Sequence, residues 1–235
     1  MNIGSEIFGK GFGFGALSGA HSTLLDNLIF STSLNGNSTS NIGTNNGTDT
    51  NITYSAGQFS QAAVFNGTSR INFSNLSALN GLTTFSCSYW INCSITSVYS
   101  HIGNWFYGTN TGSFYVRNNG NSLDIFIPSG PTTGNIASFN GFTGGVWNNV
   151  IFLYDGTQST NANKLKLYFN GTAQALTYST TIPTSLATTS DNLLTGSIDG
   201  LIFPLYGSMD EINMWNRIIT PTEIITLQTN PYPFT

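Results

Sequence analysis

The chain has 235 residues, which is enough for one all-β domain with a complete core. Only 7% of the residues are charged and the formal net charge is −4. The six basic residues are scattered along the chain (Lys10, Arg70, Arg117, Lys164, Lys166 and Arg217). Nucleic acids and anionic membranes both require clustered positive charge, so the sequence argues against either as a partner.

Residues 1–23 differ in composition from the rest of the chain, because Gly alternates with Phe between residues 9 and 15. We expect an N-terminal arm that becomes ordered by packing on a neighbouring subunit. Its apolar contacts would come from Phe8, Phe12, Phe14 and Leu17. A disordered tail and a strand of the main fold are the two alternatives. The segment lacks the basic and apolar regions of an ordinary signal peptide, so none is expected.

From residue 24 onward, short apolar runs are separated by turn residues, as in an all-β domain. The clearest run is 85–93, where apolar residues alternate with mostly polar ones at the period of a strand. We predict strands at 27–33, 62–65, 70–73, 85–93, 99–107, 113–117, 122–127, 147–154, 164–169 and 207–215. The segment 35–51 is too polar to be buried and is predicted to be a loop.

Two local signals fix a turn and a helix. Asn170-Gly171 follows a predicted strand and favours a type I′ hairpin turn. Thr220, Pro221 and Glu223 match an N-cap, a first helical residue and a capping box. One short helix is therefore predicted from Pro221 to about Thr229, where Asn230-Pro231 ends it.

Five segments, taken in order, resemble the laminin-G-like jelly-roll module of the concanavalin A-like lectin/glucanase superfamily. They are 57–67 (GQFSQAAVFNG), 85–91 (FSCSYWI), 147–150 (WNNV) with 154–156 (YDG), 165–171 (LKLYFNG), and 207–212 (GSMDEI) with 215–217, 221 and 223–224. The resemblance covers roughly residues 24–230. It implies an antiparallel β-sandwich over residues 24–235, with the arm at 1–23 outside it. This fold carries many functions, so the resemblance does not identify a ligand.

The two cysteines, Cys87 and Cys93, lie on one predicted strand. Six residues of strand separate their α-carbons by roughly 20 Å, which is too far for a disulfide. We therefore expect buried free thiols.

The sequence lacks the residues for a hydrolase. Glycoside hydrolysis requires two carboxylates that flank the scissile bond. The three glutamates are Glu6 in the arm, Glu223 in the helix cap and Glu211. The neighbours Asp210 and Glu211 would point to opposite faces of a strand, so they cannot act as a pair. His101 stands alone and is interpreted as a hydrogen-bonded strand histidine. No enzyme activity is expected.

Asp210 is the most informative single charge. By strand parity it shares a face with Ile212 and Met214, so it is expected to point inward and to need partners. One alternative is that it anchors a loop through backbone N–H groups. The other is a calcium site, as in some members of the family that the chain resembles. Other oxygen ligands would then come from Asp155, Asp191 and Asp199.

Sugar binding uses an exposed aromatic ring with amide or carboxylate groups beside it. Most large aromatic residues here are expected in the core. Trp105 and Tyr107 differ, because in the predicted strand they share one face and Phe106 takes the other. They are the candidate carbohydrate-binding residues.

Two functions fit these observations. The first is a non-enzymatic virion structural or decoration protein on a capsid surface, fibre or tail. It would dock through the arm on capsid, fibre or tail subunits, could self-associate as a homo-oligomer, and is compatible with binding of host glycans. The alternative is a bacterial carbohydrate-binding or adhesion module that is extracellular or located at the cell surface.

Overall fold

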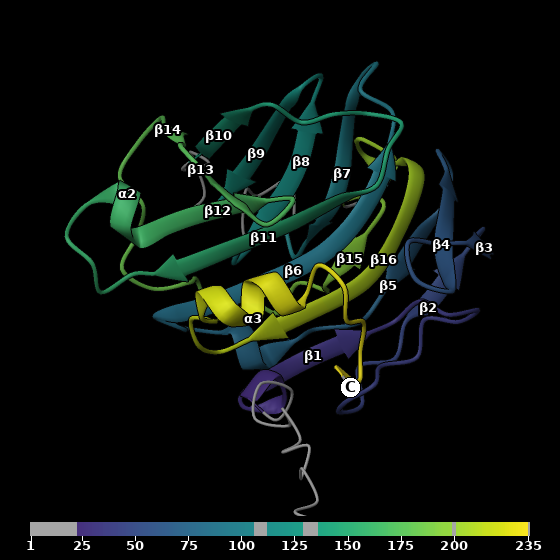
Figure 1. Cartoon of the computed structure of the whole chain (residues 1–235), viewed down its shortest axis with the longest axis horizontal. Helices are drawn as coiled ribbons and strands as arrows, with labels where there is room; N and C mark the ends of the chain where they lie inside the picture. The colour runs from purple at the N-terminus through teal and green to yellow at the C-terminus, as the bar shows by residue number, and fades with distance from the viewer. Residues whose placement is uncertain (1–22, 106–111, 129–135, 199–200, 235) are drawn as a thin grey trace, which may run out of the picture.

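The computed structural model describes residues 23–105, 112–128, 136–198 and 201–234. Two antiparallel sheets stack face to face (Figure 1). The elements are β1 (Leu28–Thr32), β2 (Thr48–Thr50), β3 (Thr53–Ala56), β4 (Gln61–Asn66), β5 (Arg70–Asn72), a 3-10 helix (Ser77–Leu79), β6 (Thr84–Cys93), β7 (Val98–Gly103), β8 (Tyr115–Asn119), β9 (Ser122–Phe126), β10 (Ile136–Asn140), β11 (Asn148–Asp155), α2 (Asn161–Lys164), β12 (Leu165–Phe169), β13 (Thr172–Gln174), β14 (Thr177–Tyr178), β15 (Leu194–Thr195), β16 (Tyr206–Trp215) and α3 (Pro221–Thr226).

The first sheet, called the β6 sheet here, has the order β13-β12-β11-β6-β16-β4-β3, and β1 also pairs with β16. The second, called the β8 sheet, has the order β14-β10-β9-β8-β7-β15-β5-β2. The predicted antiparallel β-sandwich with one short C-terminal helix is confirmed. Within the described residues, no helix has the length and apolar character needed to span a membrane.

The main core fills the space between the two sheets. In β6 the predicted alternation is confirmed, because Phe85, Cys87 and Tyr89 all belong to this core. The β8 sheet supplies Val116 and Ile125 from the opposite side. Both cysteines are buried and free, as expected. Burial stabilises the fold by roughly 25 cal/mol for each Å² of apolar surface removed from water.

The outer faces of the two sheets are covered differently. The β6 sheet carries α3, and Trp215 of β16 packs in one apolar cluster with Ile224 and Phe234 (Figure 1). On the β8 sheet, the outer face carries the aromatic cluster of Trp105, Tyr115 and other residues described below.

Two predicted local structures are confirmed. Asn170 and Gly171 have φ values of 51° and 74°, as a type I′ turn requires, and Phe169 pairs with Thr172 across it. The capping box of α3 is present, since Thr220 and Glu223 exchange side-chain to backbone hydrogen bonds.

One predicted strand is too long. The prediction was 99–107, but β7 ends at Gly103. The reason is local, because the Oδ1 of Asn104 accepts hydrogen bonds from the N–H groups of Ser113 and Phe114, at 2.9 and 3.2 Å. These bonds turn the chain out of the ladder before Trp105.

Candidate functional site

A pocket lies on the outer side of the β8 sheet, and Trp105 forms one of its walls. Its volume is about 340 Å³, and it is lined by Arg70, Asn72, Trp105, Ser190, Asp191, Asn192 and Leu194. We call it the Trp105 pocket. It combines one large aromatic ring with amide, hydroxyl, carboxylate and guanidinium groups, which is the composition expected of a carbohydrate site.

Trp105 is held rigidly in this wall. Only 6% of the residue is exposed, so Trp105 is largely buried and, contrary to expectation, not exposed. Its ring packs on Tyr115 and Phe126, with centroid distances of 6.4 and 5.9 Å. The backbone before it is fixed by Asn104, which is completely buried. Its indole Nε1 makes no hydrogen bond within the described part of the chain. The other candidate, Tyr107, lies outside the described residues.

The polar walls come from segments that are distant in sequence. β5 contributes Arg70 and Asn72, and the loop before β15 contributes residues 190–192. The register of β15 on β5 brings them together, because Leu194 pairs with Asn72. The side chain of Asn75 then holds the loop by donating to the carbonyl oxygens of Thr189 and Asp191, at 3.1 and 2.9 Å. The pocket is therefore preorganised.

No local sequence signal identifies Arg70, Asn72 and the 190–192 loop as a site. These residues form a site only because β15, a strand of two residues, pairs with both β5 and β7. A two-residue strand leaves no hydrophobic periodicity to detect.

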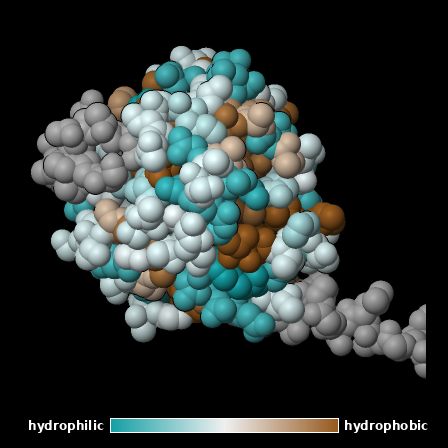
Figure 2. All heavy atoms as spheres, turned by 90° about the vertical axis from the view of Figure 1, so that its left-hand side faces the viewer, coloured by the Kyte–Doolittle hydropathy of each residue, from teal (hydrophilic) through white to brown (hydrophobic). Residues whose placement is uncertain are grey.

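A second pocket of about 340 Å³ lies at the β12 side of the β6 sheet. We call it the Lys166 pocket, and it is lined by Leu153, Asp155, Gln158, Asn163, Lys166, Tyr168, Ile218, Ile219 and Pro221. Figure 2 shows this side of the molecule, where a hydrophobic area is bordered by hydrophilic residues. A hydrogen bond from Thr157 lowers the pKa of Asp155, and the charge of Lys166 acts in the same direction.

Asp210 is buried as expected, but it does not point inward. The register of β16 on β6 shifts between Asp210 and Asn213, and Glu211 has a φ of 50°, so a β-bulge interrupts the alternation. Met209 and Ile212 both enter the core. Asp210 therefore pairs opposite Trp90 on the outer side of the sheet.

The same bulge corrects the expectation that Asp210 and Glu211 point to opposite faces. Glu211 lines a small recess together with Trp90 and Asn213 of the outer side. Asp210 Oδ2 accepts a hydrogen bond from Phe59 N at 2.9 Å, which anchors the loop between β3 and β4. Glu211 Oε2 accepts from Tyr232 N at 2.8 Å, which anchors the C-terminal segment.

Burial shifts both of these carboxyl groups. It raises the pKa of Asp210 to about 7 and that of Glu211 to about 8, although backbone N–H groups act in the opposite direction. Nearby negative charge on Asp210 raises the pKa of Glu211 further. The two groups therefore hold loops in place; near pH 7, Glu211 is mainly protonated, whereas Asp210 is close to its midpoint.

The described residues do not assemble the calcium site considered above. Asp210 Oδ1 is buried without a hydrogen-bond partner among the residues that the structure describes. Calcium takes six to eight oxygen ligands, however. Asp155 and Asp191 line two different pockets, and Asp199 lies outside the described residues. In the described part of the chain, no three His, Cys, Asp or Glu side chains come together as a metal site.

His101 is buried in a hydrogen-bonded network between the sheets. Its Nε2 lies 3.1 Å from Asn118 Oδ1, and its Nδ1 lies 3.0 Å from the Tyr89 hydroxyl. Because an amide oxygen only accepts, Nε2 carries the proton and Tyr89 donates to Nδ1. Burial lowers the pKa of His101 to about 3, so the imidazole is neutral and stabilises the core.

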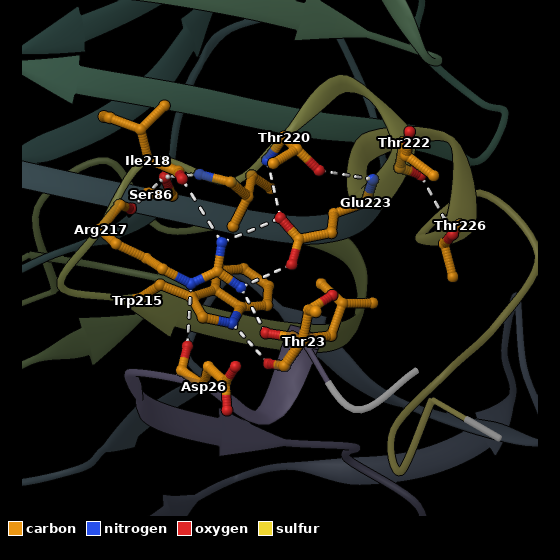
Figure 3. Close-up of polar contacts among 12 residues, drawn as sticks. Thr23, Asp26, Ser86, Trp215, Arg217, Ile218, Thr220, Thr222, Glu223 and Thr226 are labelled. Atoms are coloured by element: carbon orange, nitrogen blue, oxygen red, sulfur yellow. Dashed lines mark hydrogen bonds and ion pairs between the residues drawn. The ribbon is translucent and has the colours of Figure 1, made fainter. Parts of the chain in front are cut away.

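The arm residues Phe8, Phe12, Phe14 and Leu17 lie outside the described residues, but the point where the chain enters the sandwich is firmly held (Figure 3). Arg217 donates to the carbonyl oxygens of Thr23 and Asp26, at 2.5 and 2.9 Å. Trp215 Nε1 donates to the carbonyl of Leu24 at 2.7 Å. The guanidinium also binds both oxygens of Glu223, which caps α3.

The family profile described as the concanavalin A-like lectin/glucanases superfamily matches residues 65–225. No curated protein gives a significant match to the sequence. Solved structures do match, at low sequence identity.

Three solved structures illustrate the likeness. Domain 4 of AbnA, a GH43 extracellular arabinanase from Geobacillus stearothermophilus solved in complex with arabinotriose, is 18% identical, with a TM-score of 0.60, over 86% of this chain and 98% of that domain. The botulinum neurotoxin serotype G binding domain is 14% identical, with a TM-score of 0.66, over 86% of this chain and 50% of that one. The serotype D ligand binding domain, in complex with N-acetylneuraminic acid, is 14% identical, with a TM-score of 0.64, over 89% and 52%. This chain thus spans about half of the toxin domains.

Proposed function

Because this chain belongs to the concanavalin A-like lectin/glucanase superfamily, we propose that it is a non-catalytic carbohydrate-binding module whose Trp105 pocket receives the saccharide. The observation that carries this proposal is the pocket itself, in which a fixed tryptophan wall faces polar groups from β5 and the 190–192 loop. Sugars present apolar C–H faces and hydroxyl edges, and such a pocket is complementary to both.

Two of the similar structures support the choice of ligand class. The arabinanase domain was solved with arabinotriose and the serotype D domain with N-acetylneuraminic acid. At this level of identity they share the fold with this chain, so the Trp105 pocket is proposed from its own residues.

The arrangement of carboxyl groups supports a binding role over a hydrolytic one. Acid/base hydrolysis of a glycosidic bond needs two carboxylates about 5 to 10 Å apart. Within the described residues, the Trp105 pocket is lined by one carboxylate, Asp191, and the Lys166 pocket by one, Asp155. Asp210 and Glu211 are adjacent but buried beneath the segments that they anchor. We therefore propose that the module is not an enzyme.

A matched pair of blocking variants tests the site. Asn192→Trp places a large side chain at an exposed position of the Trp105 pocket, and Asn163→Trp does the same in the Lys166 pocket. On a glycan array, we expect Asn192→Trp to abolish binding and Asn163→Trp to preserve it. The thermal unfolding of both variants should match that of the unmodified chain. Binding that survives Asn192→Trp, or an array without any bound glycan, would contradict the proposal.

We also propose that the module is displayed on a virion and docks on a capsid, fibre or tail subunit through residues 1–23. Two observations favour this, namely the Gly/Phe composition of the segment and the firm attachment of residues 23–26 to Arg217 and Trp215. Docking through residues 1–23 requires that this segment leave the sandwich from a fixed position, and these hydrogen bonds provide it. The alternative is a bacterial module that is extracellular or located at the cell surface.

Location separates these alternatives. An antibody against the sandwich, detected by electron microscopy with gold particles, should label virions released from the producing cells. Labelling confined to the bacterial surface would favour the adhesion module instead.

A further inference from the structure

Among the residues that line the Trp105 pocket, Arg70, Trp105 and Asn72 carry hydrogen-bond donors that no described residue uses. The guanidinium of Arg70 makes no hydrogen bond or ion pair with any described residue, and neither does the indole N–H of Trp105. Asn72 is oriented by its Oδ1, which accepts from Ser74 N at 2.8 Å, so its Nδ2 group remains as a donor. All three residues line the same pocket.

Several acceptors on the same walls are already occupied. Asn72 Oδ1 is taken by Ser74. The Oδ2 of Asp191 accepts from the Thr189 hydroxyl at 2.5 Å, and the carbonyl of Asp191 accepts from Asn75. Because the guanidinium of Arg70 carries only donors, a ligand that pairs with it must supply acceptors.

Resting on the proposed carbohydrate-binding function, we propose that the Trp105 pocket selects saccharides that carry a carboxylate, as uronic and nonulosonic acids do. The planar guanidinium of Arg70 matches a carboxylate with two parallel hydrogen bonds. The remaining donors of Trp105 and Asn72 meet ring or hydroxyl oxygens of the same sugar.

The negative charge of Asp191 refines the class of acid. The hydroxyl groups of a sugar acid can donate to Asp191, which a bare anion cannot do. The pocket thus matches one negative charge together with neighbouring hydroxyl groups.

The test compares acids with their neutral counterparts by titration calorimetry on the full chain. The probes are trigalacturonic acid against its carboxyl-reduced derivative, and 3′-sialyllactose against lactose. At least one acid should bind about tenfold or more tightly than its neutral counterpart, because hydrogen bonds to a charged group are stronger than those between neutral groups. Binding of trigalacturonic acid would identify a uronic acid as the ligand, and binding of 3′-sialyllactose would identify a nonulosonic acid.

Two charge-neutralising variants provide the control. Arg70→Gln should remove the preference for the acid, with an affinity loss of about tenfold, the equivalent of about 1.4 kcal/mol. Lys166→Gln changes the net charge equally in the other pocket and should leave the preference intact. Unfolding curves of the two variants establish that both are folded.

Each outcome has a clear meaning. Equal binding of acid and neutral sugars, abolished by Asn192→Trp, would overturn the selectivity and leave carbohydrate binding in place. An equal loss in Arg70→Gln and Lys166→Gln would show general charge attraction and would also overturn it. Absence of binding to all four probes, with neutral glycans bound on an array, contradicts the acid preference alone. If the chain binds neither the four probes nor any glycan on an array, the proposed function is contradicted.

Discussion

Replacing Glu211 with Gln should change how the stability of the fold depends on pH. Glu211 is 3% exposed, and its carboxyl holds the N–H of Tyr232 at 2.8 Å. Burial raises its pKa from 4.5 to about 8, while hydrogen bonding by Tyr232 and Ser33 acts in the opposite direction. Gln mimics the neutral acid in size and polarity but cannot ionise.

The sign of the effect follows from proton binding. Between pH 4.5 and pH 8, Glu211 is protonated in the folded state and ionised in the unfolded state, so folding takes up a proton. Its contribution to stability is fully present below pH 4.5 and is lost as pH rises toward 8. Each pH unit in this window costs the unmodified protein about 1.4 kcal/mol relative to Glu211→Gln.

Two other buried groups, Asp210 and His101, also have shifted pKa values. Asp210, with its pKa raised to about 7, also loses stability as pH rises, whereas His101, with its pKa lowered to about 3, loses stability as pH falls below 6.5. His101 does not depend on Glu211, so its contribution cancels. The charge of Asp210 raises the pKa of Glu211, so Asp210 is coupled to it and cancels only below pH 7, where Asp210 is mainly protonated in the folded state. The difference in unfolding free energy should therefore widen by about 2.7 kcal/mol from pH 5 to pH 7.

Guanidinium denaturation followed by tryptophan fluorescence at pH 5, 6, 7 and 8 measures this difference. Asp155→Asn is the control, because the pKa of Asp155 is lowered and the group is ionised in both states across the window. Its difference from the unmodified protein should not vary with pH. Parallel curves for Glu211→Gln and the unmodified protein would refute the reasoning.

Two further substitutions test the packing. Arg217→Ala leaves the buried Glu223 unpaired and should cost about 2–3 kcal/mol at pH 7 by chemical denaturation. Although burial raises the pKa of Glu223, hydrogen bonds from Arg217 lower it to about 2. The loss of stability in Arg217→Ala should therefore shrink as pH falls from 4.5 toward 2. A loss that does not depend on pH would contradict the pairing. Gly196 and Gly171 both have positive φ, but only at Gly196 would a Cβ lie within 2.1 Å of the Phe65 ring. Gly171→Ala should cost about 1 kcal/mol and Gly196→Ala about 2–4 kcal/mol, and equal costs in thermal unfolding would contradict this.

Much of the fold was predictable because its signals are local. The alternation along β6 sets which residues enter the core, and it needs only the period of a strand. The turn at Asn170-Gly171 and the capping box at Thr220 and Glu223 are also determined by adjacent residues. Such features can be identified without knowledge of distant contacts.

The features that escaped prediction depend on long-range pairing. The bulge at Asp210 and Glu211 lies where β16 changes one partner from β4 to β1 while it stays paired with β6, and it reverses the parity that the sequence implies. Arg70 and the 190–192 loop meet only through β15. Of the candidate site, the sequence therefore identified Trp105 but none of the polar residues around it.

The position of β16 also constrains when the molecule can fold. This strand lies near the C-terminal end of the chain, yet it joins β4 and β1 to β6 in the middle of its sheet. During synthesis β1, β4 and β6 lack their partner β16, and their strand edges stay unpaired, until residue 215 has left the ribosome. We therefore expect a late, all-or-none closure of the sandwich, in which nascent chains that stop short of β16 stay sensitive to proteases and chaperone-bound.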